Sequence, residues 1–410
     1  MSDDVMEVLQ RTFPKSVQPG LPKLKPPKPG WKSYRFGELL EQVQRRVHLQ
    51  PDETYDLVTV KRSRGGIESR GRLRGSQISV TSQFRIAEGD FLISKRQIVH
   101  GACGVVSSGF DGAVVSNEYS VLRCKPNIDL AFLQYLSHSV YFQQTCFHSS
   151  IGVHIEKMIF KLDEWFKWPV NIPSLPEQQK ITAFLGAVDA KLAALAAKQD
   201  TLVRFKTGLM QKLFSQQIRF MQDDGGAFPD WQERRLGDVV KVFSGGTPAA
   251  SVRAYYSGEI PFIKSGEIAK TQTAQFINPL GFKSSSAKMV EKGDILYALY
   301  GANSGEVAIS KISGAINQAV MCIRTKQVRE YIFQLLAFNR ARICAAYLQG
   351  GQGNLSADIV KSLKFKLPDL DEQQKIANTL AAMDAKIQAV ADQVAKLQTF
   401  KKGLLQQMFV

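Results

Sequence analysis

The residues best suited to chemistry in this sequence are cations that gather in one glycine-containing stretch. Lys61 to Gly75 reads KRSRGGIESRGRLRG and holds six cations against one acid, Glu68. Glycine lets the backbone turn tightly, and arginine binds both phosphate oxygens and the guanine edge in a major groove. The stretch therefore predicts a DNA-contacting loop, with a solvated charged loop as the alternative. The predicted contacts are Lys61, Arg62, Arg64, Arg70, Arg72 and Arg74.

Motifs for catalysis or metal binding are missing from the sequence. It has no GxxxxGK[ST] phosphate loop, no HExxH and no Cys/His cluster with zinc spacing. The Asn-Pro-Pro-Tyr type of tetrapeptide used by amino-methyltransferases is absent as well. We therefore predict no catalytic residue, no metal site and no cofactor bound by this chain.

A few local patterns resemble sites only superficially. GGQGN at 350–354 follows no predicted strand, which indicates a flexible turn before a helix cap and not a dinucleotide site. Asp90 and Asp294 have lysines nearby but lack the paired acids of a nuclease motif. Isolated His/Cys neighbours are usually structural, which is our interpretation of His100 with Cys103 and of Cys146 with His148.

Composition and charge favour a polyanionic partner. Lys and Arg number 53 against 37 Asp and Glu, which gives a formal net charge of +16. A surplus of this size favours nucleic acid, although a basic surface kept for solubility is the alternative. The five cysteines form no CxxC pair, no apolar run approaches ~18 residues, and the N-terminus lacks the apolar region of a signal peptide. These features predict a cytoplasmic protein without disulfides or a membrane span.

These residues must be positioned by a chain that contains a long internal repeat. Residues 173–214 return as residues 368–409, at an offset of 195 with no gap and with 21 of 42 positions identical. After its first turn each copy lacks proline and carries seam residues alternately three and four positions apart, which predicts a long helix with a coiled-coil seam. A helix of roughly 38 residues is about 57 Å long.

The simplest partner for one seam is the other seam of the same chain, and two unrelated amphipathic surface helices are the alternative. In the first copy the seam residues are Ile181, Leu185, Val188, Leu192, Leu195 and Leu202. In the second copy they are Ile376, Leu380, Met383, Ile387, Val390 and Leu397.

The repeat divides the chain into alternating globular and helical parts. The predicted order is an extended Pro/Lys-rich tail at 1–30 with no role of its own or, as the alternative, a contact with phosphate, a globular domain at 31–172, a helical region at 173–217, a linker at 218–230, a second globular domain at 231–367 and a second helical region at 368–410. The domains echo each other loosely, with Gly89-Asp90 matching Gly293-Asp294. In the first domain we expect a strand at 55–61, a turn and strand at 88–96, a strand pair at 112–123 and helix at 129–148.

Several motifs together resemble one known family. Glu-Gln-Gln-Lys-Ile occurs at 177–181 and 372–376, and Phe-Lys-x-Gly-Leu at 205–209 and 400–404. The second domain adds SGGTP at 244–248, YYSGEIPFIKSGEI at 255–268, KGDILYALYGANSG at 292–305 and AINQAV at 315–320. From residue 31 onward the chain resembles the DNA-specificity (S) subunit of type I restriction-modification enzymes. The first domain departs most, because it has VVSNE where the second has INQ and it lacks SGGTP.

The resemblance implies an α+β fold, in which two mixed α/β target recognition domains are joined by two long antiparallel coiled-coil helices in a pseudo-two-fold repeat. Each domain is expected to read one half of a bipartite, asymmetric site in double-stranded DNA. The helices are expected to set the spacing and to dock two methyltransferase (M) subunits. S-adenosylmethionine, ATP and magnesium are expected on partner subunits, including restriction/translocase (R) subunits, so that this chain is not an enzyme. The expected contacts in the second domain are Thr247, Lys264, Ser265, Lys270, Tyr300 and Asn303.

Two other functional classes stay open on the sequence. One is a structural adaptor of the same fold that binds RNA or protein, which a basic surplus confined to the tail would favour. The other is a self-contained nuclease, which metal-dependent cleavage by the purified chain would reveal.

Overall fold

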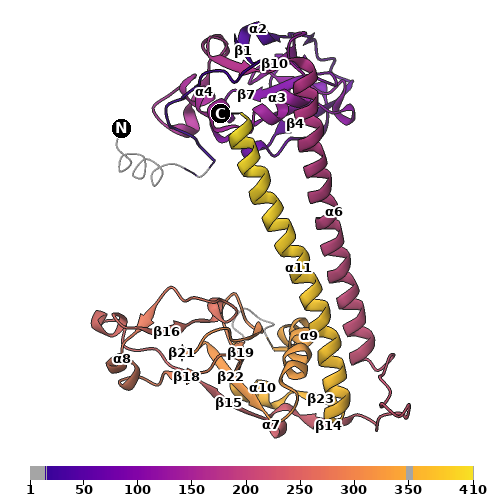
Figure 1. Cartoon of the computed structure of the whole chain (residues 1–410), viewed down its shortest axis with the longest axis vertical. Coiled ribbons are helices and arrows are strands. Elements are labelled where there is room, and N and C mark those ends of the chain that lie inside the picture. Colours follow the sequence, from indigo (N-terminus) through magenta and orange to yellow (C-terminus); the bar gives the residue numbers. More distant parts are fainter. Residues whose placement is uncertain (1–13, 15, 348–353, 410) are drawn as a thin grey trace. The chain divides into compact units, whose positions relative to one another are not determined.

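The structure is a computed structural model, and it describes residues 14, 16–347 and 354–409. The first thirteen residues and the glycines at 350–353 that we predict to form a turn lie outside these. The described residues form two compact units, Met1–Leu195 with Gln393–Val410 and Ala196–Asp392. Each unit therefore holds one globular domain with half of each long helix. The predicted α+β class is confirmed (Figure 1).

The first globular domain contains two main sheets and two short two-stranded ones, β1 with β13 and β11 with β12. A four-stranded sheet has the order β2-β10-β7-β8, and a five-stranded sheet has the order β3-β6-β9-β4-β5. Its strands are β1 (Lys32–Arg35), β2 (Leu40–Gln42), β3 (Arg46–Val47), β4 (Thr54–Val60), β5 (Ile67–Arg74), β6 (Gln83–Arg85), β7 (Phe91–Ser94), β8 (Cys103–Val105), β9 (Val114–Ser116), β10 (Tyr119–Cys124), β11 (Ser150–Ile151), β12 (Ile159–Phe160) and β13 (Pro169–Ile172). The strands predicted at 55–61, 88–96 and 112–123 are confirmed.

The helical structure predicted at 129–148 is confirmed, and the chain forms two helices there. These are α3 (Leu130–Leu136) and α4 (Val140–His148), and the hydroxyl of Ser139 caps the second by accepting from the N–H of Phe142 at 3.1 Å. Serine competes with the helix ladder for backbone groups, so it favours a new helix start. The short helices are α2 (Phe36–Leu39) and α5 (Leu162–Trp165). Phe36 stacks on Trp165 with ring centroids 4.2 Å apart, which places both helices on the core.

The second globular domain repeats this topology. The sheet β15-β22-β19-β20 corresponds to β2-β10-β7-β8, and the parallel pair β16 and β21 corresponds to β4 and β9. Its strands are β14 (Gln232–Arg235), β15 (Val240–Ser244), β16 (Ile260–Ile263), β17 (Phe276–Ile277), β18 (Lys288–Val290), β19 (Ile295–Ala298), β20 (Val307–Ile309), β21 (Gly314–Ile316), β22 (Val320–Thr325) and β23 (Lys364–Leu367). Its helices are α7 (Leu236–Val239), α8 (Pro279–Lys283), α9 (Arg329–Tyr347) and α10 (Ala357–Ser362).

The two copies of the repeat form the helices α6 (Leu175–Phe214) and α11 (Leu370–Met408). The predicted seam residues Ile181, Leu185, Val188, Leu195, Ile376, Leu380, Met383 and Val390 are buried, and Leu192, Leu202, Ile387 and Leu397 are half-buried. In the second unit the two segments run antiparallel, with Lys206 Nζ 2.6 Å from Asp384. The repeat places Lys401 and Asp189 at the same two positions of the first unit, and they also form an ion pair.

The repeated Glu-Gln-Gln motif anchors each helix to its own globular domain. Glu177 accepts a hydrogen bond from the indole of Trp31 at 3.0 Å, and Glu372 accepts one from Trp231 at 2.9 Å. The next residue, Gln178 or Gln373, accepts from a backbone N–H just before the helix α3 or α9, at 2.8 and 3.2 Å. The identical residues of the repeat therefore serve one structural job twice.

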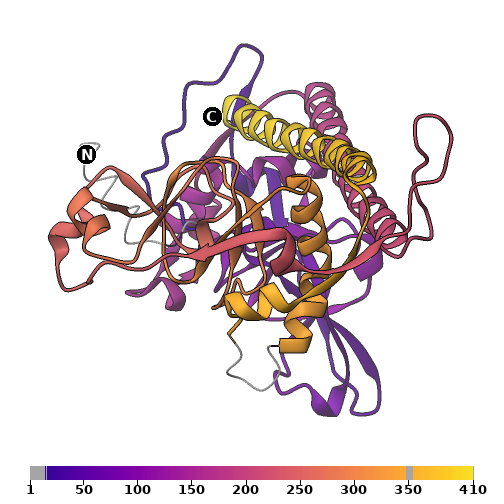
Figure 2. The same ribbon diagram turned by 90° about the horizontal axis from the view of Figure 1, so that it is seen from below.

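The linker after α6 is an extended loop (Figure 2). Its Arg219 reaches back to Glu372 at the start of α11, at 2.7 Å. The linker thus connects the end of one long helix with the start of the other inside the second unit.

Residues 16–30 form an extended strap on the first unit, which confirms the predicted extended conformation, and the strap makes specific contacts that the sequence does not predict. Val17 is buried, and the Ser16 hydroxyl lies 2.9 Å from Nδ1 of His100. Lys28 donates to the carbonyl oxygen of Gln407 at 2.7 Å, in the last turn of α11. A cation is favourable there because the last carbonyl groups of a helix lack partners.

Candidate nucleic-acid interface

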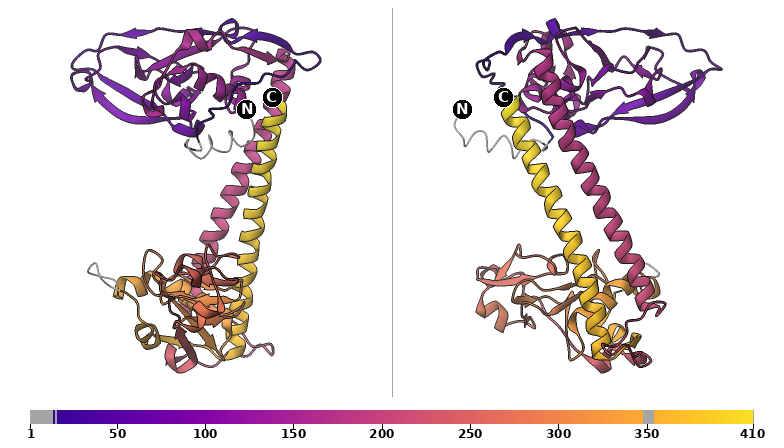
Figure 3. Two further views of the ribbon diagram at one scale, coloured as in Figure 1. Left: turned by 90° about the vertical axis from the view of Figure 1, so that its left-hand side faces the viewer. Right: turned by 45° about the vertical axis from the view of Figure 1, so that its right-hand side comes forward.

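The basic stretch forms a hairpin at the edge of the five-stranded sheet. β4 and β5 pair antiparallel on either side of a turn at Arg62–Arg64, and β5 is exposed from Glu68 to Arg74. Both views in Figure 3 show the indigo-to-purple strands of this unit reaching away from the long helices. An exposed edge strand bearing cations can follow a phosphate backbone, because nothing in its own sheet covers it.

Ion pairs within the domain engage three of the six predicted cations. The pairs are Lys61 with Glu68 at 2.7 Å, Arg62 with Glu156 at 2.7 Å and Arg72 with Asp56 at 2.8 Å. All three are exposed pairs of the kind worth about 0–1 kcal/mol, so phosphate can compete for the cations. In the described part of the chain Arg70 and Arg74 have no acidic partner.

Arg64 differs from the other five cations because the fold half-buries it. Its backbone N–H donates to the carbonyl oxygen of Gly101 at 2.9 Å, and its φ of 59° lies in the left-handed region. Burial lowers the pKa of its guanidinium. Its buried Nε has no hydrogen-bond partner among the described groups. Arg64 therefore shapes the turn between β4 and β5, whereas the other five cations face solvent.

Replacing His138 by glutamine is expected to make the first unit more resistant to acid. Burial, with the positive charges of Arg64 and Lys401, lowers the pKa of His138 to about 4. In the unfolded chain this histidine binds a proton near its ordinary pKa of 6.5, whereas in the folded chain it stays neutral down to about pH 4. Protonation therefore favours the unfolded chain between these two values, and the stability that the neutral histidine contributes above pH 6.5 is lost as the pH falls toward 4. Between pH 7 and 4.5 the wild type should lose about 2 kcal/mol more than the variant in urea unfolding. Equal losses would contradict a neutral His138.

Three loops of the first domain lie together, and one of them contains the turn at Arg62–Arg64. We call them the first loop cluster. They are Lys61–Gly66 after β4, Lys95–Ala102 between β7 and β8, and Asn117–Glu118 between β9 and β10. The bond from Arg64 to Gly101 joins the first two, and the N–H of Lys95 donates to the carbonyl oxygen of Glu118 at 2.8 Å, which joins the last two.

The second domain brings the equivalent loops together in a second loop cluster. They are Lys264–Gln275 after β16, Leu299–Glu306 between β19 and β20, and Asn317–Ala319 between β21 and β22. The N–H of Leu299 donates to Ala319 at 2.8 Å, and the N–H of Asn317 donates to Ile263 at 3.3 Å. Five of the six predicted contacts of this domain lie in the cluster, namely Lys264, Ser265, Lys270, Tyr300 and Asn303. The sixth, Thr247, touches the cluster through a hydrogen bond to Gln318.

A cleft of about 420 Å³ opens beside the second loop cluster. Thr247 and Lys264 line it together with Arg253, Tyr256 and Gln275. The cleft thus combines two cations with aromatic and amide groups, a set that can bind phosphate and base edges.

The prediction missed Arg96 and Glu118, which belong to the first loop cluster. Arg96 donates to Glu118 from Nε at 2.6 Å and from Nη2 at 3.2 Å. A signal was available, because the match of Gly89-Asp90 to Gly293-Asp294 carries Tyr300 onto Arg96.

The two aspartates weighed for a nuclease have structural partners. Asp90 is fully buried and binds Arg45 at 2.6 Å and Arg123 at 3.3 Å. Asp294 binds Arg324 at 2.7 Å. Burial raises the pKa of Asp294, but the hydrogen bonds from Arg324 and from the backbone of Glu291 outweigh burial and hold it below its usual value.

Neither a cluster of metal ligands nor a membrane-spanning helix occurs among the described residues. Within residues 14, 16–347 and 354–409, no three His, Cys, Asp or Glu side chains gather as metal ligands would. In the same part of the chain no helix combines the length and the apolar character of a membrane span.

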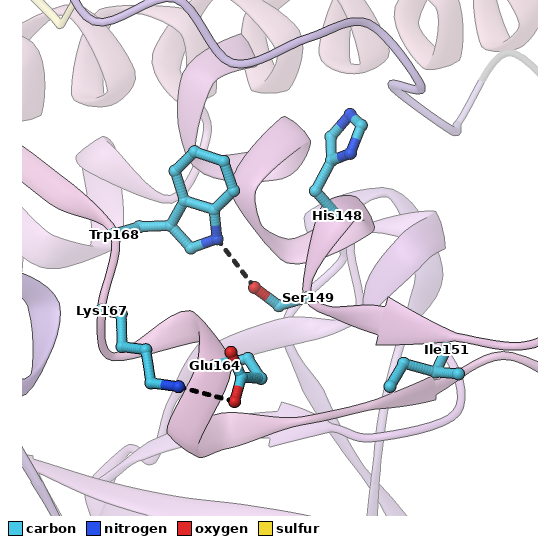
Figure 4. Close-up of a pocket in the computed structure, with 6 residues that line it drawn as sticks. All are labelled: His148, Ser149, Ile151, Glu164, Lys167 and Trp168. Carbon is cyan, nitrogen blue, oxygen red and sulfur yellow. Dashed lines mark hydrogen bonds and ion pairs between the residues drawn. The ribbon is translucent and has the colours of Figure 1, made fainter.

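A separate concavity of about 370 Å³ lies in the first unit, and Figure 4 shows the residues that line it. His148, Ser149, Ile151, Glu164, Lys167 and Trp168 line it. Its polar groups largely satisfy one another, since Trp168 donates to Ser149 at 3.0 Å and Lys167 pairs with Glu164 at 2.7 Å. None of the predicted contacts lies in it, so the loop clusters remain the candidate interface.

Comparison with known proteins identifies one family. A family model described as "Type I restriction modification DNA specificity domain" matches residues 29–203 and 229–399. The MjaIX specificity subunit of Methanocaldococcus jannaschii is 28% identical over 211 residues, covering 48% of each chain. The EcoR124I/EcoR124II specificity subunit of Escherichia coli is 22% identical over 238 residues, covering 55% of this chain and 57% of its own. The chain thus spans about half the length of the curated relatives that it matches.

Solved structures support the fold. The structure described as "Structural basis underlying complex assembly and conformational transition of the type I R-M system" contains a chain that matches with a TM-score of 0.63 and 20% identity, covering 93% of this chain and 98% of its own. The HsdS subunit from Thermoanaerobacter tengcongensis matches with a TM-score of 0.51 and 19% identity, covering 93% and 97%.

Proposed function

This chain belongs to the type I restriction-modification DNA specificity family, and from this premise we propose that it is the non-catalytic DNA-reading subunit of a cytoplasmic methyltransferase and restriction complex. Each globular domain reads one half of a bipartite, asymmetric site in double-stranded DNA. S-adenosylmethionine, ATP and magnesium belong to the methyltransferase and restriction subunits.

The observation that carries this proposal is the pair of loop clusters. Both domains present loops from the same three positions of the same topology, after β4 or β16, after β7 or β19, and before β10 or β22. Their side chains differ, with cations at Lys61 and Arg62 in one and a lysine, a serine and an amide at Lys264, Ser265 and Asn303 in the other. Equivalent loops with different side chains suit two different half-sites on one duplex.

The long helices suit a second task, which is assembly. Their repeat offers two equivalent surfaces, and the identical pairs Lys206 with Asp384 and Lys401 with Asp189 mark the equivalence. A two-fold repeat binds two copies of one partner in the same way. The helices therefore dock two methyltransferase subunits and set the number of unread base pairs between the half-sites.

A methylation map tests the proposed function. The chain is co-expressed with its methyltransferase subunit in a cell that lacks adenine methylation, and the modified adenines are located across the genome. The expected result is one split, asymmetric motif with a fixed gap that disappears when this chain is left out. A stable complex without methylation would favour the adaptor class, and failure to form any complex would overturn the proposal.

A further inference from the structure

We propose that Arg96, held by Glu118, reads a guanine in the half-site of the first domain. This inference rests on the proposed function, because it assumes that the first loop cluster faces DNA. It assigns base reading to a residue outside the basic stretch of 61–75.

The position of Arg96 in the first domain matches that of Tyr300 in the second. Arg96 lies two residues beyond the end of β7, as Tyr300 lies two residues beyond the end of β19. The preceding residues, Lys95 and Leu299, donate their backbone N–H to the residue just before β10 or β22, at 2.8 Å in both domains. Arg96 therefore occupies the place in the first domain that a predicted contact occupies in the second.

The guanidinium of Arg96 keeps N–H donors free for a DNA base. A guanidinium has five N–H donors, and Glu118 accepts one from Nε and one from Nη2. The two N–H groups of Nη1 and the second N–H of Nη2 remain free. One N–H of Nη1 and the free N–H of Nη2 lie side by side on the outer edge of the guanidinium. Two donors side by side on one edge match O6 and N7 of guanine in the major groove. Arg96 makes no other side-chain hydrogen bond within the described residues.

The loop that carries Arg96 and the turn that carries Glu118 are held rigidly together by hydrogen bonds. The side chain of Lys95 donates to the carbonyl oxygen of Asn117 at 2.7 Å, and the N–H of Glu118 donates to the hydroxyl of Ser116 at 3.4 Å. The turn that carries the carboxylate is thus tied to the loop that carries Arg96. Fixing an arginine before DNA arrives lowers the entropy lost on binding.

The pair is also accessible. The Arg96 and Glu118 side chains are 51% and 43% exposed, and an exposed ion pair adds only about 0–1 kcal/mol to stability. Changing Arg96 should therefore leave the fold intact, so that effects on recognition can be read directly.

The test compares wild type, R96A, R96K and E118Q, each as the full chain with its methyltransferase subunit. The methylation map of the wild type first gives the split motif. R96A is expected to relax one guanine-containing base pair of one half-site about 5- to 150-fold, measured by competition among duplexes that carry each of the four base pairs there. R96K should relax the same position, because lysine keeps the charge but lacks the planar fork. E118Q should relax it less.

The control is K167A, which removes another exposed ion pair of the same domain, with Glu164, and should leave the motif unchanged. If R96A keeps full preference at every position, or weakens all sequences equally, the inference is overturned while the proposed function stands. If the wild-type map contains no split motif, the proposed function itself has failed.

Discussion

Replacing Arg219 by methionine is expected to destabilise the second unit by about 3–5 kcal/mol. Arg219 lies in the linker and donates to Glu372 from Nε at 3.1 Å and from Nη2 at 2.7 Å. The Glu372 side chain is 0% exposed. Without the guanidinium, a buried carboxylate keeps only the Trp231 indole as a side-chain donor, and water cannot replace the missing positive charge.

Urea unfolding followed by hydrogen exchange of the first turns of α11 measures this effect, because exchange reports the two units separately. The matched control is R204M, which breaks an exposed pair with Asp200 on α6 and should cost less than about 1 kcal/mol. The double variant R219M/E372Q should be more stable than R219M, since a neutral amide still accepts from Trp231. Equal losses for R219M and R204M would show that the buried pair contributes nothing special.

Neutralising the five solvent-facing cations of the basic stretch is expected to weaken DNA binding on the order of 100-fold or more at ~100 mM salt. The variant K61Q/R62Q/R70Q/R72Q/R74Q retains Arg64, because that side chain supports the turn from a half-buried position. Cations that neutralise phosphates release counterions, so the slope of log affinity against log salt should flatten by about 0.9 for each phosphate that the variant no longer neutralises. Where these cations bind phosphate, the affinities for specific and for non-specific duplexes should fall by the same factor.

The measurement is a salt titration of binding by the complex with its methyltransferase subunits, whose assembly is checked by gel filtration. A control variant neutralises five exposed lysines outside the long helices and the loop clusters, Lys32, Lys161, Lys167, Lys241 and Lys366, which removes the same charge from other surfaces. The double variant R70Q/R74Q alone should flatten the slope by about 2, since these two arginines have no acidic partner to give up among the residues that the structure describes. Unchanged affinity in the five-fold variant would sink the assignment of this hairpin to DNA.

The long helices could be predicted because their information is local and repeated. A seam with spacings of three and four residues marks one face of a helix wherever it occurs, and the ungapped repeat shows that the same face is used twice. The helix bounds at Leu175–Phe214 and Leu370–Met408 fall inside the predicted regions. By contrast, the strap at 16–30 has no periodicity, and its contacts with His100 and Gln407 depend on residues far away in the sequence.

The sequence by itself determined the two globular domains, the two long helices and the cationic character of the first domain, because periodicity, repetition and charge are readable along the chain, and the α+β class followed from the family resemblance. Only the tertiary structure decided which cations face solvent. It drew Arg64 into the domain, paired Lys61, Arg62 and Arg72 with acids, and set Arg96 on Glu118 across 22 residues of sequence. Which acid reaches which cation depends on how β-strands far apart in the chain pair, and the register of that pairing is specified wherever one face of a sheet is buried. The residue types therefore predict a nucleic-acid partner, whereas the fold determines which residues are free to bind it.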